Sequence, residues 1–246
     1  MYAITRRVLL LALLYLLVAA LAQAESTGSA NEGLSSRALL DELHDESGWI
    51  QVQGHGAGGV VIYRKEVKRS DLLGFRGELV VEAGSEQLFA LISDLDRHAG
   101  LSDDIPLVLS QVLAQNEDGV DYLQLLDAPD WTLTRDRYWF NRSFVIRDLD
   151  GQVGHHRQSW LGIDPKLYPE RWRALLSDHP GAVRTPINLG SWEVIPLSAG
   201  RSRLIYRVLS DPGGRLPSAV QRLVTARTLP LNLLQFQDEV RRQAGP

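Results

Sequence analysis

The chain has 246 residues, of which 44% are hydrophobic and 23% charged, a composition typical of a globular protein with one large or two small domains. Its formal net charge is −4 at pH 7, and it contains no cysteine. An acidic chain lacks the basic face that nucleic-acid binding needs, so we expect no nucleic-acid partner. The absence of cysteine excludes disulfides, thiol catalysis and cysteine-ligated metals.

The first 24 residues have the layout of a cleavable signal peptide. Arg6 and Arg7 precede an apolar run at residues 8–21, and a small-x-small sequence then predicts cleavage after Ala24. The alternative is an uncleaved anchor, but the run is shorter than the roughly 20 residues that a spanning helix needs. The sequence therefore predicts a periplasmic or secreted protein.

A flexible polar leader at residues 25–33 is predicted to join this peptide to a single domain at residues 34–246. Without Arg6 and Arg7 the chain has 24 Lys and Arg against 30 Asp and Glu, a net charge of −6. A domain of this size can bury an adequate core without disulfides. We expect a monomer with at most transient membrane contact.

Two helices and three strands are predicted in the first hundred residues. Ser35 or Ser36 caps a helix that ends near Gly48, and a second, amphipathic helix spans residues 86–95. The glycine-rich residues 54–59 predict a hairpin turn, because they lack the Lys-Ser or Lys-Thr and the following helix of a phosphate-binding loop. The strands fall at residues 49–53, 60–63 and 72–82.

The rest of the chain predicts antiparallel hairpins. Turn sequences at residues 116–119 and 148–151 each separate two strands. A proline-rich insertion at residues 162–186, with a short helix at 171–176, precedes a last hairpin. The predicted strands lie at residues 108–113, 120–126, 138–147, 152–160, 190–196 and 203–209.

A long helix from Leu216-Pro217 to about residue 240 ends the chain. Pro217 fits the first turn of a helix, whereas Pro230 in the interior predicts a kink near residues 226–229. The kink suits either a gate or a helix that follows the curvature of the sheet. The residues expected to face the sheet are Val220, Leu223, Val224, Leu231, Leu234 and Val240.

These elements predict an α+β fold: a curved antiparallel sheet with helices on one face and the long C-terminal helix across it. Their order, and several short motifs between residues 48 and 242, resemble the START (StAR-related lipid transfer) domains. The resemblance implies a bacterial, secreted member with a helix-grip fold, in which the last helix covers an apolar cavity for one hydrophobic ligand, without a cofactor. The motifs are at residues 61–65, 73–77, 120–122, 129–136, 190–196 and 211–217.

The resemblance and the placement of aromatic residues give a set of candidate ligand-binding residues. Cholesterol-binding members of the family place an arginine in the cavity, but the same offset from Arg135 lands here on Asn141, and the arginine follows at Arg142. Sterol specificity is therefore not implied. The candidates are Tyr122, Trp131, Trp139, Asn141, Arg142, Trp192, Tyr206, Leu223, Leu231 and Leu234.

The strand at residues 136–147 has two faces that compete for the interior. Periodicity favours the face of Tyr138, Phe140 and Arg142, whereas the register of the family favours that of Trp139, Asn141 and Ser143. An arginine inside would need a ligand headgroup or an internal ion pair. Otherwise, Arg142 points outward.

No catalytic motif such as Gly-x-Ser-x-Gly or His-Glu-x-x-His occurs. The acidic loop at residues 94–104 fits no metal-ligand spacing, so we expect no metal site. His155 and His156 are adjacent on a predicted strand, so one is expected to face solvent and the other to pack inside.

The sequence thus favours a lipid-binding or lipid-transfer protein over an enzyme. The alternative is a cyclase- or aromatase-like enzyme of the helix-grip superfamily that acts on a small hydrophobic substrate in the same cavity. Its acid or base would be Asp121, Tyr122 or Arg142.

Overall fold

The computed structural model describes residues 35–53, 59–68, 72–103, 105–128, 135–211, 213 and 218–244, with the backbone alone for residues 53, 218–227 and 244. The predicted signal peptide and leader, the glycine stretch at 54–58 and the motif residues 129–134 lie outside this part of the chain. The described α-helices are α2 (Ser36–His44), α3 (Ser85–Ser93), α4 (Pro169–Asp178) and α5 (Ser218–Ala244).

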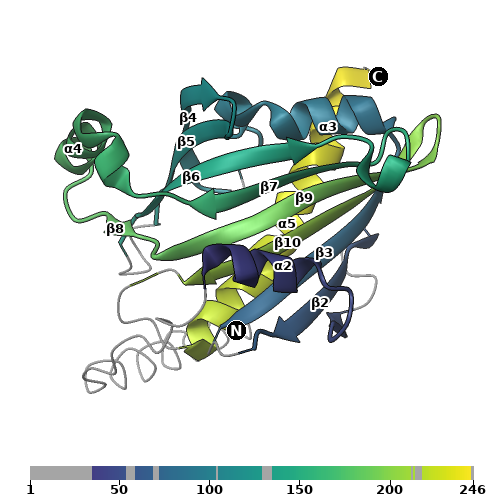
Figure 1. Cartoon of the computed structure of the whole chain (residues 1–246), viewed down its shortest axis with the longest axis horizontal. Helices are drawn as coiled ribbons and strands as arrows, with labels where there is room; N and C mark the ends of the chain where they lie inside the picture. Colours follow the sequence, from purple (N-terminus) through teal and green to yellow (C-terminus); the bar gives the residue numbers. More distant parts are fainter. Residues whose placement is uncertain are drawn as a thin grey trace, which may run out of the picture.

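Ten strands in the described residues form one large sheet (Figure 1). They are β1 (Ile50–Gln53), β2 (Val61–Glu66), β3 (Leu73–Val81), β4 (Leu107–Asn116), β5 (Gly119–Leu126), β6 (Arg137–Ile146), β7 (His156–Gly162), β8 (Val183–Arg184), β9 (Ile187–Ser198) and β10 (Arg201–Asp211). Short 3-10 turns lie at Leu95–Arg97, Leu149–Gly151 and Pro165–Leu167.

The strand order is β1-β2-β3-β10-β9-β7-β6-β5-β4, and every neighbouring pair in it is antiparallel. The predicted hairpins β1–β2, β4–β5, β6–β7 and β9–β10 are thus confirmed. The short strand β8, which runs parallel to β6, was not predicted because two residues carry no periodic pattern. The central pairing of β10 with β3 joins two strands that lie far apart in the sequence.

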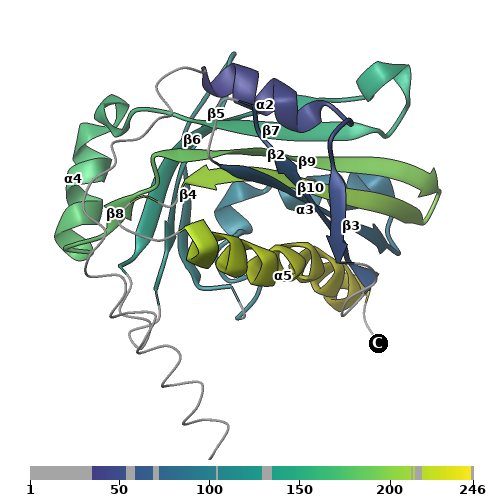
Figure 2. The same ribbon diagram turned by 90° about the horizontal axis from the view of Figure 1, so that it is seen from below.

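Helices cover both faces of the sheet, not one face as predicted (Figure 2). α3 and α5 pack on one face, which we call the inner face, and α2 packs on the opposite, outer face. The reason is that the outer face is also apolar. Leu189 of β9 and Leu209 of β10 point there, and the leucines of α2 bury them.

α5 follows helical spacing, and Val240 and Leu234 pack against the inner face as predicted, whereas Leu231 does not. The side chains of Val220, Leu223 and Val224 lie outside the described residues. Leu229, Leu233, Phe236 and Val240 are buried in the inner cluster, at intervals that place them on one side of a helix. Gly77 of β3 permits this close approach, since a Cβ there would overlap the Leu233 side chain. No helix in the described ranges is both long and apolar enough to cross a membrane.

Strand β7 starts at His156 and not at residue 152 as predicted. The preceding loop is held by Asp148, whose carboxylate accepts a hydrogen bond from the Gly154 backbone N–H at 2.8 Å. Asp148 and Asp150 both have positive φ, a conformation that aspartate tolerates better than most residues. The tight loop therefore uses residues that alternation alone assigned to the strand.

Candidate functional site

Three aromatic rings lie side by side on the inner face. The ring centroid of Tyr206 on β10 is 4.0 Å from that of Trp192 on β9 and 5.9 Å from that of Trp160 on β7. Phe236 of α5 meets Trp192 edge-on at 5.1 Å. Gly190 makes room for this group, since a Cβ there would lie 2.7 Å from the Trp160 ring. The sheet thus offers α5 a broad aromatic surface.

Tyr206 is the least buried ring of this aromatic group. Trp160 and Trp192 are buried, whereas Tyr206 keeps part of its surface accessible and is only half-buried. Burial raises the pKa of the Tyr206 hydroxyl well above the ordinary value. Tyr206 is therefore the member of the group that retains surface for contact with a bound molecule.

Next to the aromatic surface lies a hydrogen-bonded series that we call the neutral row: Tyr122, Asn141, Asn188 and Trp160. The Trp160 indole N–H donates to Asn188 Oδ1 at 2.8 Å. Asn141 Nδ2 donates to Asn188 Oδ1 at 3.4 Å and to the Tyr122 hydroxyl at 3.2 Å. Asn141 is fully buried, and its Oδ1 has no hydrogen-bond partner. Such an atom is rare in a folded protein.

The register of the strands brings the neutral row together. Tyr122 of β5 lies opposite Asn141 of β6, and Trp160 of β7 lies opposite Gly190 of β9, two positions from Asn188. Side chains two positions apart on a strand point to the same face. Burial raises the pKa of the Tyr122 hydroxyl, which therefore stays protonated at neutral pH.

Arg142 lies on the opposite face of β6 from Asn141, so the two cannot contact one ligand on the inner face. Its Nε donates to Asp121 Oδ1 at 2.6 Å and its Nη2 to Asp121 Oδ2 at 2.9 Å. The Tyr168 hydroxyl donates to Asp121 Oδ2 at 2.7 Å. Burial would raise the pKa of Asp121, but these hydrogen bonds outweigh it and lower that pKa.

The three residues considered as an enzyme's acid or base do not converge. Asp121 and Arg142 form a bidentate ion pair on the outer face, whereas Tyr122 points to the inner face. The described residues also contain no group of three or more acidic or histidine side chains that could hold a metal ion.

Five candidates are brought together on the inner face: Tyr122, Trp139, Asn141, Trp192 and Tyr206. Leu234 packs at the edge of the inner cluster, while Leu231 is half-buried and lies off the sheet-facing side of α5. Trp131 and the side chain of Leu223 lie outside the described residues.

Asn188 is the residue of the neutral row that sequence reasoning missed. It stands two places before Gly190 and four before Trp192 on β9, so alternation places it on their face. A polar residue at such an inward position was the available signal. It was hidden because the predicted strand began only at residue 190.

A second buried polar group occupies the outer face, and we call it the outer ion cluster: Glu46, His155, Arg157, Glu193 and Arg207. Glu193 accepts from His155 Nε2 at 2.8 Å, from Arg157 Nε at 2.9 Å and from Arg207 Nη1 at 2.8 Å. Arg207 also reaches Glu46 at 2.5 Å. Burial opposes ionisation of Glu193, but Arg207 and Arg157 hold its pKa at about 2.

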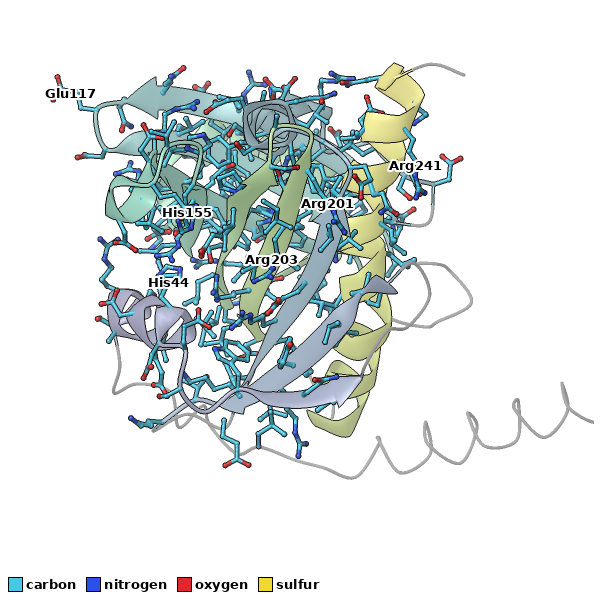
Figure 3. The ribbon with its side chains drawn as sticks, turned by 90° about the vertical axis from the view of Figure 1, so that its right-hand side faces the viewer. His44, Glu117, His155, Arg201, Arg203 and Arg241 are labelled. Atoms are coloured by element: carbon cyan, nitrogen blue, oxygen red, sulfur yellow. The ribbon has the colours of Figure 1, made fainter. Side chains whose placement is uncertain are left out.

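His44 of α2 joins the same face (Figure 3), with Nε2 3.1 Å from Ser191 Oγ. The two adjacent histidines point to opposite faces as predicted, His155 to Glu193 and His156 to Glu86 at 2.6 Å. Neither faces solvent, however, because His155 is only 8% exposed and His156, which packs on Phe89 of α3, is 1% exposed. That part of the expectation was wrong.

The architecture is a helix grip: a curved antiparallel sheet that holds a long C-terminal helix on its inner face. It is similar to human StAR-related lipid transfer protein 5, with a TM-score of 0.68 and 19% identity over 85% of this chain and 96% of that one. A StAR-related lipid transfer protein of Xanthomonas axonopodis has a TM-score of 0.63 and 21% identity, over 79% of this chain and 99% of that one. Human STARD10 has a TM-score of 0.66 and 14% identity, over 89% of this chain and 82% of that one.

These likenesses establish that the chain has the START fold, as the motifs predicted. In sequence, it is 28% identical over 167 residues to an uncharacterised protein of Pseudomonas aeruginosa, which is 65% of this chain and 71% of that protein. No protein-family model matches the sequence.

Proposed function

We propose that this protein binds one lipid or lipid-like molecule between the inner face of the sheet and α5, and carries it between membranes. The observation that carries the proposal is the half-buried Tyr206 on the inner face, flanked by the stacked rings of Trp160 and Trp192. The similar folds of human StAR-related lipid transfer protein 5 and of the StAR-related lipid transfer protein of Xanthomonas axonopodis support it.

The energetics suit this function. Burial of an apolar chain contributes about 0.8 kcal/mol per methylene relative to water. An apolar, aromatic-lined site therefore competes with the membrane interior for the same chain. The inner cluster supplies apolar and aromatic side chains from both the sheet and α5, and Phe236 of α5 meets Trp192 of the sheet edge-on.

We further propose that residues 1–24 direct the chain to the periplasm, where it acts as a monomer that touches membranes transiently. Its negative net charge gives no electrostatic attraction to anionic lipid surfaces, which favours brief contact with membranes. Amino-terminal sequencing of the protein from an envelope fraction should give Glu25 as the first residue. A cytoplasmic chain that retains Arg6 and Arg7 would contradict this.

Lipid carriage is tested by moving a labelled lipid between donor and acceptor vesicles, and by mass spectrometry of organic extracts from the purified protein. We expect a co-purifying hydrophobic molecule and transfer that scales with protein concentration. The variant Val112→Trp should reduce transfer, because Val112 is half-buried on the inner face beside Tyr122. Val153→Trp is the matched control, since Val153 is 81% exposed. Neither ligand nor transfer in the parent protein would refute the proposal.

A further inference from the structure

The hydrogen-bond directions within the neutral row are fixed by chemistry. An indole nitrogen can only donate, so the Asn188 atom 2.8 Å from Trp160 Nε1 must be the carbonyl oxygen. That oxygen can only accept. The Asn141 atom facing it must therefore be the Nδ2 amide, which orients the whole Asn141 side chain.

This orientation leaves one acceptor and one donor unused. Both protons of Asn141 Nδ2 are directed to Asn188 and Tyr122, while Asn141 Oδ1 is buried without a partner. The Tyr122 hydroxyl accepts from Asn141, so its own proton remains available to donate. An acceptor and a donor thus stand side by side on the inner face.

The surroundings of this pair are uncharged. The neighbours of Tyr122 and Asn141 on the same two strands are Val120 paired with Ser143 and Gln124 paired with Trp139. Gly162 of β7, opposite Asn141, places no side chain against the acceptor. A Cβ built there would lie 3.9 Å from Asn141 Oδ1 and 4.0 Å from the Asn188 backbone oxygen.

We propose that the neutral row recognises an uncharged group that both donates and accepts a hydrogen bond, a hydroxyl or an amide, on the buried end of the lipid. The ligand donates to Asn141 Oδ1 and accepts from the Tyr122 hydroxyl. This inference rests on the proposed lipid-binding function. It narrows the ligand to lipids with a free hydroxyl or amide N–H.

The same geometry disfavours other polar groups. A ketone, ester or ether accepts from Tyr122 but cannot donate, so Asn141 Oδ1 stays buried and unpaired. A carboxylate brings a charge to a site whose strand neighbours supply no cation, and its oxygens face the oxygen of Asn141.

The test compares 1-hexadecanol with hexadecyl methyl ether, which differ in the single donor proton. Each radiolabelled probe is placed at trace level in phosphatidylcholine vesicles, and the amount carried by the full mature protein is measured after the vesicles are pelleted. Palmitate and hexadecane serve as charged and apolar references. The two probes partition differently into vesicles, so the alcohol-to-ether ratio is read relative to that of a variant.

In the variant Asn141→Leu the ratio should fall by about tenfold, as expected for loss of one buried hydrogen bond and its unpaired acceptor. Tyr122→Phe should weaken extraction of both probes and leave the ratio unchanged, because both accept from Tyr122. Gln152→Leu is the matched control. It replaces an exposed amide and should change neither the extraction of the probes nor the alcohol-to-ether ratio. Thermal unfolding of each variant confirms that it folds.

The outcomes separate this inference from the proposed function. If no probe is carried at all, lipid carriage itself fails. If alcohol and ether are carried but Asn141→Leu leaves their ratio unchanged, only the recognition by the neutral row is overturned. If Asn141→Leu does not fold, two other results overturn the inference. One is a sharp fall of the alcohol-to-ether ratio in Tyr122→Phe, and the other is preferential extraction of palmitate by the parent protein.

Discussion

The two faces of the sheet both bury polar side chains, and they do so in opposite ways. On the outer face, Glu193 is surrounded by Arg157, Arg207 and His155, so its charge is compensated within the protein. On the inner face, the neutral row carries no charge and leaves Asn141 Oδ1 unpartnered. An ion network whose charges are compensated within the protein stabilises a fold, whereas an uncharged row with an unpaired acceptor suits a ligand.

Strand β10 shows the contrast within two residues. Tyr206 points to the aromatic inner face, and Arg207 points into the outer ion cluster with only 1% of its surface exposed. Because side chains alternate along a strand, one backbone segment supports both environments. The comparison predicts that changes on the outer face alter stability, and that changes on the inner face alter ligand binding.

The largest effect on stability is expected for Arg207→Leu. Removing one partner of a buried ion pair leaves Glu193 less compensated and should cost about 3 kcal/mol of unfolding free energy in urea titrations. Arg203→Leu is the matched control, an exposed arginine on the same face of β10, and should change stability by at most about 0.5 kcal/mol. Neither variant should change lipid transfer per folded molecule. A selective loss of transfer in Arg207→Leu would contradict the assignment of stability to the outer face and ligand binding to the inner face.

Acid should destabilise the protein through the outer face. Burial, followed by the charges of Arg157 and Arg207, lowers the pKa of His44 from 6.5 to about 4. The unfolded chain takes up that proton first, so the stability is present above pH 6.5 and lost between pH 6.5 and 4. The loss is about 2 kcal/mol after allowance for the partial exposure of His44.

Glu193 extends the acid effect to lower pH. Its folded-state pKa of about 2 lies below the ordinary 4.5, so its contribution is present above pH 4.5 and lost as pH falls toward 2, by about 3 kcal/mol. Chemical denaturation at a series of pH values measures both steps. His44→Gln should flatten the first step alone, and an unchanged slope between pH 6.5 and 4 would contradict the assignment.

On the inner face, Gly190→Ala should cost about 1–3 kcal/mol, because its Cβ would overlap the Arg207 backbone oxygen and press on Trp160. The displaced ring should also reduce lipid transfer. Gly200→Ala, where a Cβ meets nothing within 4 Å, is the control for both measurements. Equal transfer by the two variants at equal folded concentration would show that Trp160 does not border the ligand.

The smallest effect is expected for Arg142→Gln. Arg142 is 32% exposed in its ion pair with Asp121, and glutamine can keep one hydrogen bond, so unfolding free energy should fall by about 1 kcal/mol. Because Arg142 lies on the outer face, extraction of 1-hexadecanol should change by less than about twofold. A larger drop in the extraction of 1-hexadecanol would indicate that Arg142 contacts the ligand.

Local sequence determined much of this molecule. Ser35 caps α2 as predicted, its side chain accepting from the Ala38 N–H at 3.3 Å, and the apolar residues of α3 fall at helical spacing. The turn at residues 116–119 joins β4 and β5 as expected. Alternation along β6 also separated Asn141 from Arg142 correctly, since neighbouring side chains in a strand must point apart.

Only the tertiary structure decided which of those two faces looks inward. Both faces of the sheet are covered by helices, so Phe140 and Trp139 alike have apolar surroundings or buried partners, and hydrophobicity gives no preference. The pairing of β3 with β10 and the register that joins Tyr122 to Asn141 depend on residues far apart in the chain. The neutral row forms because those pairings place Asn188 and Trp160 beside Tyr122 and Asn141. No local pattern specifies a contact between strands so distant in sequence.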